Sequence, residues 1–161
     1  MKQTVYIETT IFSYLTSRPS RNLVAAAWQQ VTSDWWVNQR DKFELYISEL
    51  VVTEAERGNP EAAARRLEQL QKISELSITE EVILFADTLV EKNAIPIKAA
   101  DDAMHIAIAA IHGVDYLLTW NCRHIDNAET KPLIRKVCEI SGYSYPEICT
   151  PQELMGETNN E

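Results

Sequence analysis

The feature that most limits the fold of this chain is a regular alternation of short apolar runs with longer segments of helical periodicity. Residues 5–7 and 43–48 are rich in β-branched and aromatic side chains, which is typical of buried strands. Residues 22–37, between these runs, predict a helix with one apolar stripe at helical spacing, formed by Val24, Trp28, Val31 and Trp35. Strands that alternate with helices predict an α/β domain with a mostly parallel sheet.

The same alternation continues to the C-terminus. We expect helices over residues 49–57, 60–73, 101–112 and 129–140 and another beginning at 79, with further strands over 115–119 and 147–150. The sheet should contain about four or five strands. A length of 161 residues suggests one domain, which we expect to span residues 1–156 and to leave 157–161 as a flexible tail.

The net charge and the cysteines indicate which binding partners and which cellular compartment to expect for this protein. The net charge of −9 counts against nucleic-acid binding, unless the acids gather at a metal site or a basic partner covers part of the surface. Cys122, Cys138 and Cys149 form no disulfide or zinc framework, which favours a reducing, cytoplasmic location. The N-terminal residues lack the apolar region of a signal peptide, and the apolar run 106–111 is too short to span a membrane.

Several common α/β functions require motifs that this sequence does not contain. The four glycines form neither GxGxxG nor GxxxxGK[ST], so a dinucleotide site or a P-loop is not expected. There is also no GxSxG elbow, CxxC pair or HExxH motif.

Polar side chains follow three of the predicted strands, and two acids begin a helix. They are Glu8, Thr9 and Thr10; Ser48, Glu49 and Glu54; Thr119 and Asn121; and, at the helix start, Asp101 and Asp102. Ligands of parallel sheets bind at the carboxyl ends of the strands. Carboxylates that converge there repel one another unless a cation is bound or their pKa values rise. Hard divalent cations prefer such oxygen ligands, so we expect Mg²⁺ or Mn²⁺.

Four segments, in this order, resemble the blocks of the PIN-domain family. They are Val5-Tyr6-Ile7-Glu8-Thr9-Thr10, Ile47 to Glu54, Asp102-Ala103-Met104-His105-Ile106-Ala107-Ile108-Ala109, and Asp115 to Asn121. The resemblance implies a three-layer α/β/α fold and a metal-dependent endoribonuclease whose site acids are Glu8, Glu54 and Asp102. It also implies Mg²⁺ or Mn²⁺ as cofactor, RNA as substrate and a homodimer. In the VapC-type toxin branch it further implies the toxin of a type II toxin–antitoxin pair, with an antitoxin protein as partner.

Two positions depart from the family pattern and keep a second interpretation open. Glu8 stands where Asp is usual, and Asn121 stands where many members have Asp. These differences favour a catalytically weakened PIN-like module for binding or assembly. A third interpretation, an unrelated phosphatase-like α/β enzyme, is disfavoured because no Asp-x-Asp follows the first strand.

Further residues are candidates for supporting roles. We expect Thr9, Asp101, Thr119 and Asn121 to orient the site carboxylates through hydrogen bonds. Candidate RNA contacts are Arg18, Lys98 and Arg123, for which a solvated surface is the alternative. His105 is expected to be a packed histidine rather than a metal ligand, whereas Trp120 is left open as a residue that could stack on a base.

Overall fold

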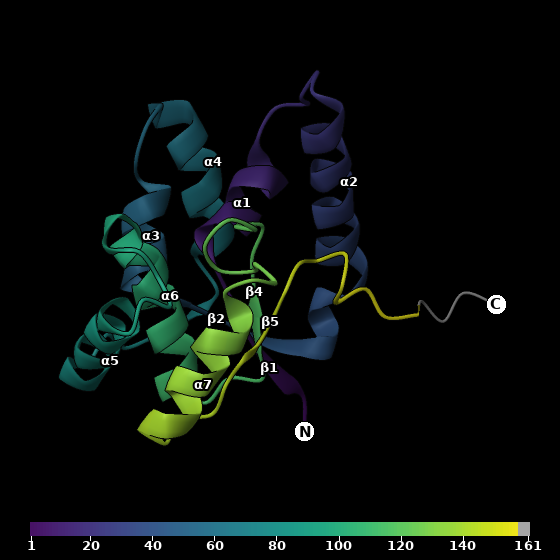
Figure 1. The fold of residues 1–161 in the computed structure, drawn as a ribbon. Helices are drawn as coiled ribbons and strands as arrows, with labels where there is room; N and C mark the ends of the chain where they lie inside the picture. The colour runs from purple at the N-terminus through teal and green to yellow at the C-terminus, as the bar shows by residue number, and fades with distance from the viewer. Residues whose placement is uncertain (158–161) are drawn as a thin grey trace.

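A computed structural model describes residues 1–157 of the chain (Figure 1). Its centre is a five-stranded sheet in the order β3-β2-β1-β4-β5, with every neighbouring pair parallel. The strands are β1 (Gln3–Ile7), β2 (Phe43–Ser48), β3 (Ser74–Leu76), β4 (Tyr116–Leu118) and β5 (Glu147–Cys149). The predicted α/β class with a parallel sheet is therefore confirmed. Most of the expected tail, residues 158–161, lies outside the described residues.

Within residues 1–157, seven α-helices surround the sheet. They are α1 (Thr9–Thr16), α2 (Leu23–Asn38), α3 (Glu49–Ala55), α4 (Pro60–Leu70), α5 (Glu80–Glu91), α6 (Ala100–Ile111) and α7 (Lys131–Ser141), with short 3-10 helices at Arg40–Lys42 and Ile97–Ala99. Helix α1 contacts α2, α3 and α4, helix α3 also contacts α4, and α5 packs on α6 and α7. Right-handed crossovers place these two groups on opposite faces of the sheet, because the chain moves outward from β1 in opposite directions. The result is the expected three-layer α/β/α arrangement.

Local sequence signals account for the start of most helices. Asn22, Asn59 and Thr79 each accept a hydrogen bond from a backbone N–H in the first turn of the helix that follows. Pro60 adds a favoured first-turn residue to α4. Ser48 both ends β2 and caps α3, so this helix begins directly at the carboxyl end of the strand.

The structure differs from the sequence expectation at α1, β3 and α2. Helix α1 was not expected, because its eight residues are too few to show helical periodicity. Strand β3 was also missed, because it has three residues and its exposed Ser74 and Glu75 interrupt any apolar run. The predicted α2 stripe is fully buried only at Trp35, whereas Val24 is 60% exposed.

The core is centred on β1, where Val5, Tyr6 and Ile7 are completely buried. This burial follows from the position of β1, which has a strand on each side and helices on both faces. All three cysteines are free thiols. Within residues 1–157, none of the helices combines the length and the apolar content needed to cross a bilayer.

Candidate metal centre

Two acidic side chains and one imidazole meet at the carboxyl end of the central strands. Glu8 follows β1, Glu54 lies in α3, and His105 lies in α6. One potential ligand atom from each of the three residues lies within 4.8 Å of the other two. The nearby acids Glu49 and Glu56 are exposed, so Glu54 is the member of this segment that reaches the cluster. Three distant parts of the sequence therefore supply one compact group of donors.

Glu8 is almost completely buried, at 3% exposure. Its Oε2 accepts hydrogen bonds from the hydroxyls of Thr10 and Thr119, at 2.5 and 2.7 Å. Burial raises the pKa of Glu8, and the two hydroxyl donors and the nearby His105 offset only part of this effect. Because no donor within residues 1–157 hydrogen-bonds to Oε1, this oxygen remains open for another partner.

Glu54 shows the same division between its two carboxylate oxygens. Its Oε1 accepts a hydrogen bond from the Thr9 hydroxyl at 2.7 Å and lies 2.5 Å from Nε2 of His105. Oε2 receives no hydrogen bond from the described residues. Burial opposes ionisation of Glu54, but the hydrogen bond and charge of His105 outweigh it, so the pKa of Glu54 is lowered.

His105 is completely buried and has partners on both ring nitrogens. Nε2 faces Glu54, and Nδ1 lies 2.7 Å from the hydroxyl of Tyr6. Burial alone would lower the pKa of His105, but the hydrogen bond to Glu54 and the charges of Glu8, Glu54 and Asp102 raise it. The expectation of a packed histidine agrees with its burial, but it missed the contact with Glu54. The spacing of three residues in a helix relates His105 to Asp102, but no sequence signal relates it to Glu54.

Asp102 lies outside the 4.8 Å group formed by Glu8, Glu54 and His105. Its Oδ2 is 3.0 Å from Nδ1 of His124, which lies in the loop after β4. Both side chains are about one-fifth exposed, at 18% for Asp102 and 21% for His124. Asp102 is still close enough to contribute to the raised pKa of His105. It therefore lies beside the cluster, paired with His124, for which the sequence predicted no role at the site.

The other residues that were expected to orient the site carboxylates fall into two groups. Thr9 and Thr119 donate hydrogen bonds to the carboxylates of Glu54 and Glu8. Asp101 instead faces outward to Arg57, whose Nη1 is 3.6 Å away. This opposite orientation follows from the rotation of about 100° between consecutive helical residues.

Asn121 does not reach either glutamate through any described hydrogen bond. Its Oδ1 accepts from the backbone N–H groups of Arg123 and His124, at 3.2 and 3.0 Å. The side chain therefore orders the turn that follows β4. That turn also carries His124, the residue that pairs with Asp102.

Trp120 is not available for stacking on a base, because its side chain is only 5% exposed. The ring stacks on Trp28 with centroids 4.6 Å apart, and Nε1 donates to Thr32 at 2.7 Å. Its backbone N–H donates to the hydroxyl of Thr10. Trp120 thus fixes the end of β4 against α2 and the start of α1.

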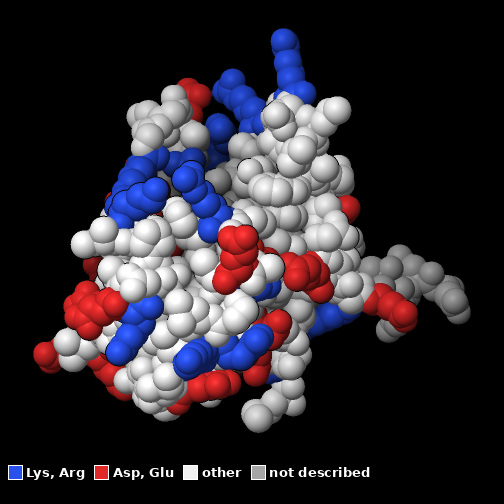
Figure 2. Space-filling model, viewed as in Figure 1, with Lys and Arg blue, Asp and Glu red and all other residues white. Residues whose placement is uncertain are grey.

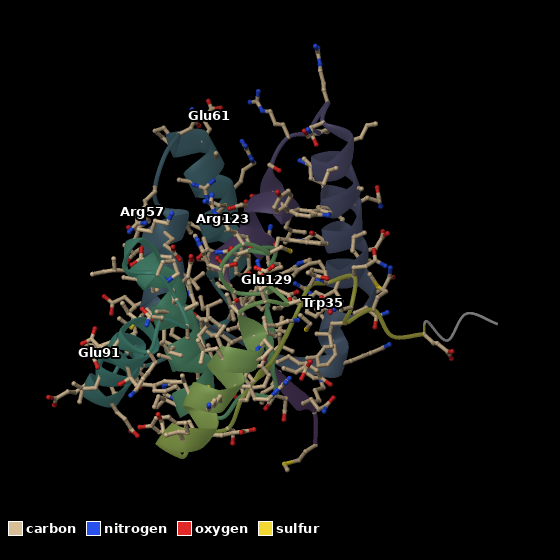
Figure 3. All side chains as sticks on the ribbon, viewed as in Figure 1. Trp35, Arg57, Glu61, Glu91, Arg123 and Glu129 are labelled. Atoms are coloured by element: carbon tan, nitrogen blue, oxygen red, sulfur yellow. The ribbon has the colours of Figure 1, made fainter. Side chains whose placement is uncertain are left out.

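Positive charge gathers over the part of the surface near this cluster, despite the negative total. Figure 2 shows Lys and Arg at the top of the view, over α3, α4 and the α1–α2 connection. Arginines in these segments and in the loop after β4 are Arg18, Arg21, Arg57, Arg65, Arg66 and Arg123. Figure 3 labels Arg57 and Arg123 on the same upper part of the molecule. The charge of Arg57 also contributes to the lowered pKa of Glu54.

The three candidate RNA contacts differ in how they are engaged. Arg18 forms an exposed ion pair with Glu61 at 3.6 Å. Lys98 is exposed in the turn before α6, and Arg123 is exposed in the loop after β4. A separate cavity of 580 Å³ lies at the opposite end of the sheet, lined by residues that include Lys2, Phe43 and Ser74. None of the clustered carboxylates lines this cavity.

The donor set suits a hard divalent cation. Each glutamate has one oxygen held by two hydrogen bonds and a second oxygen that the described residues leave open. Carboxylate oxygens are the preferred ligands of Mg²⁺ and Mn²⁺. Glu8 is held in a buried place where ionisation is unfavourable, so a cation would stabilise its charged form.

Comparisons with known proteins agree with this arrangement. The family model described as "PIN domain" matches residues 5–129, and the chain therefore belongs to the PIN-domain family. Among solved structures, it is similar to a chain in the crystal structure of VapBC2 from Rickettsia felis bound to a DNA fragment from their promoter. That similarity has a TM-score of 0.53 at 12% identity, covering 92% of this chain and 98% of the other, and it supports the fold. No curated protein matches the chain.

Proposed function

We propose that this PIN-domain chain is a metal-dependent endoribonuclease that hydrolyses phosphodiester bonds in RNA. The observation that carries the proposal is the convergence of Glu8 and Glu54, each with one oxygen fixed and one left open. Glu8, Glu54 and Asp102 would bind Mg²⁺ or Mn²⁺, directly or through water. A bound cation would activate a water molecule for attack on phosphorus and would stabilise the charge that develops there.

The protein's own groups have defined tasks in this proposal. Thr10 and Thr119 hold Oε2 of Glu8, and Thr9 holds Oε1 of Glu54, so neither carboxylate needs to reorient when the cation binds. Such preorganisation matters because a metal site loses affinity when its ligands must first be ordered. Asp102 lies at the edge of the cluster, where its partial exposure allows contact with the substrate side.

The basic surface supports RNA as the substrate. Arg18, Lys98 and Arg123, together with Arg57, would contact phosphates on either side of the cleaved bond. The net charge of −9 would otherwise repel an RNA backbone, so local positive charge and a bound cation are both needed. Arg57 is the best placed of these residues, because its charge already acts on Glu54.

We further propose that the chain is the toxin of a type II toxin–antitoxin pair. The support is the sequence resemblance to the VapC-type toxin branch, together with the fold shared with a chain of the VapBC2 structure from Rickettsia felis. An antitoxin protein would then be a natural partner. We also propose a homodimer, as the family resemblance implies, and a cytoplasmic location, which is consistent with the free cysteines.

A catalytically weakened PIN-like module remains the second candidate, because one specific observation favours it. Asn121 uses its side-chain oxygen within its own loop and adds no charge to the cluster. A chain with a weak metal site would show no rise in melting temperature at millimolar Mn²⁺. A clear rise would favour the nuclease.

The proposed reaction is tested by Mn²⁺-dependent cleavage of a mixed RNA pool. Wild type would be compared with Glu8→Gln and Asp102→Asn, and with Asp87→Asn, which changes an exposed acid on α5. We expect cleavage by wild type and Asp87→Asn and a loss of at least tenfold in the two site variants. Equal cleavage by all four proteins would contradict the assignment of the site.

A further inference from the structure

Tyr6 and His105 lie next to the glutamates, but the proposed reaction gives neither of them a task. The hydroxyl of Tyr6 is 2.8 Å from Oγ of Ser48 and 2.7 Å from Nδ1 of His105. Nε2 of His105 is in turn 2.5 Å from Oε1 of Glu54. These contacts form a continuous chain of hydrogen bonds from the end of β2, through the interior, to Glu54.

Three of the four residues in this series of hydrogen bonds have no access to solvent. Ser48, Tyr6 and His105 are each 0% exposed, whereas the side chain of Glu54 is 18% exposed. Buried polar groups need partners, and each of these groups finds its partner in the next member of the chain. These hydrogen bonds therefore connect the packed interior to Glu54, the more exposed of the two clustered glutamates.

The geometry argues against His105 as a direct metal ligand. A histidine binds a metal through the lone pair of one ring nitrogen, while the other nitrogen donates to a neighbour. Both nitrogens of His105 already have protein partners, Tyr6 on one side and Glu54 on the other. Binding a cation would require the ring to give up one of these contacts in a space with no exposed surface.

The contacts at Glu54 show what the ring does instead. A carboxylate oxygen only accepts hydrogen bonds, so Nε2 of His105 carries the hydrogen that it shares with Oε1. The hydroxyl of Thr9 donates to the same oxygen. Two donors from different elements thus converge on Oε1, and this leaves Oε2 as the atom available to a cation.

We infer that His105 and Tyr6 are positioning residues for the metal site. Tyr6 fixes the imidazole ring, and the ring fixes the rotation of the Glu54 carboxylate so that Oε2 is presented to the cation. This inference rests on the proposed metal site, but it adds two residues and a ligand atom to it. Removing a group that orients a metal ligand through a hydrogen bond commonly weakens metal affinity by roughly 10- to 100-fold.

Metal affinity, rather than activity, provides the test. The Mn²⁺ dissociation constant would be measured by electron paramagnetic resonance of free Mn²⁺ for wild type, Tyr6→Phe, His105→Leu and His105→Gln. We expect Tyr6→Phe and His105→Leu to bind Mn²⁺ about tenfold more weakly or worse. His105→Gln keeps an N–H donor in the side chain and should recover part of the loss.

The matched control is Tyr116→Phe on the neighbouring strand β4. Its hydroxyl donates to Gln3 at 3.3 Å near the opposite end of the sheet, so the same chemical change should leave Mn²⁺ affinity within twofold of wild type. Affinities would be measured well below the melting temperature of each variant. A loss in Tyr116→Phe equal to that in Tyr6→Phe would overturn the inference, because the effect would then be general.

A second measurement uses wild type alone, so its result does not depend on whether a variant folds. Pulsed electron paramagnetic resonance of Mn²⁺ bound to wild type detects nitrogen that is directly coordinated to the ion. We expect no directly bound nitrogen, and its detection would overturn the positioning role by making His105 a ligand.

The affinity measurements also separate this inference from the proposed function. If wild type does not bind Mn²⁺ at millimolar concentration, the metal site itself is wrong, and the inference is overturned together with it. If wild type binds but Tyr6→Phe and His105→Leu bind equally well, only the positioning role is overturned.

Discussion

The hydroxyl of Thr119 donates a hydrogen bond to the carboxylate of Glu8 at 2.7 Å, although 111 residues separate the two positions in the sequence. The contact joins the carboxyl ends of β4 and β1, which are neighbours in the sheet. Thr119 is completely buried, so the donor cannot be replaced by solvent without moving the strand ends. One of the two hydrogen bonds that orient Glu8 is therefore set by the ends of neighbouring strands, and Thr10 of α1 donates the other.

We expect Thr119→Val to reduce the free energy of unfolding by about 1–3 kcal/mol, because it removes a donor from a buried carboxylate. The backbone N–H of Asn121 would lose its acceptor as well. Urea unfolding at pH 8 measures the effect. Thr88→Val is the control, because its hydroxyl bonds only within helix α5, and we expect a change within about 0.5 kcal/mol. Equal changes in both variants would show that Thr119 has no special role.

Glu8→Gln should stabilise the metal-free protein at pH 8. Burial raises the pKa of Glu8 above its ordinary value of 4.5, so the folded protein binds this proton more tightly than the unfolded chain does. The stabilisation that comes from binding this proton is fully present below the pKa that Glu8 has in the unfolded chain. It is lost as the pH rises through the higher pKa that Glu8 has in the folded protein. The substitution removes this loss, so we expect a higher urea midpoint than that of wild type in EDTA at pH 8.

The same Glu8→Gln variant should lose the stabilisation that Mn²⁺ gives to wild type, because it lacks an anionic ligand. Urea midpoints measured in EDTA and in saturating Mn²⁺ test both statements together. A variant that is less stable than wild type in EDTA, yet equally stabilised by Mn²⁺, would contradict the role assigned to Glu8.

The stability of the metal-free protein should fall as pH rises above about 6.5. The pKa of His105 is raised against the effect of burial, by its hydrogen bond to Glu54 and by the charges of Glu8, Glu54 and Asp102, while Tyr6 faces its other nitrogen. Stability from a raised histidine pKa is fully present below the unfolded pKa and is lost as pH rises through the folded pKa. The lowered pKa of Glu54 acts at the acid end, where its stabilisation is lost as pH falls.

Urea midpoints in EDTA between pH 5 and 9 measure this dependence. His105→Gln, which cannot titrate, should flatten the decline above neutrality. Saturating Mn²⁺ should reverse the trend in wild type, because the metal competes with protons for the same carboxylates. A metal-free midpoint that rises steadily to pH 9 would contradict the linkage.

RNA binding should depend on the arginines near the metal centre. We expect Arg57→Ala and Arg123→Ala each to weaken binding of a labelled single-stranded RNA and to reduce the slope of log affinity against log salt by about 0.7. Arg135→Ala on α7 is the matched control, because that guanidinium lies over the ring of Tyr145 and should not contact RNA. Fluorescence anisotropy in Ca²⁺ measures binding without relying on cleavage. A salt slope unchanged in Arg57→Ala and Arg123→Ala would exclude both from the RNA path.

Much of the fold could be predicted because its strands and helices have strong local patterns. The apolar runs of β1 and β2 and the alanine-rich α6 are recognisable without any tertiary information. Strand β3 was missed because it depends on pairing with β2, and its own side chains are mostly exposed. Helix α1 was missed because it begins directly after β1, with no loop to mark the change.

The candidate site was only partly visible in the sequence, for a different physical reason. Glu8 follows a buried strand, so its place at the carboxyl edge could be inferred from the sheet alone. Glu54 could be selected over Glu49 and Glu56 only through the family pattern, which the exposure of the other two supports. The contacts of His105 with Tyr6 and Glu54 could not be inferred, because they join side chains that local periodicity does not relate.

The central claim is that Glu8 and Glu54 present their open oxygens to one divalent cation. Anomalous diffraction from crystals soaked in Mn²⁺ tests it most directly, because the peak locates the ion without any assumption about activity. We predict a peak within about 2.5 Å of one carboxylate oxygen from each of the two glutamates. A Mn²⁺ peak elsewhere on the protein, with none between Glu8 and Glu54, would contradict the account.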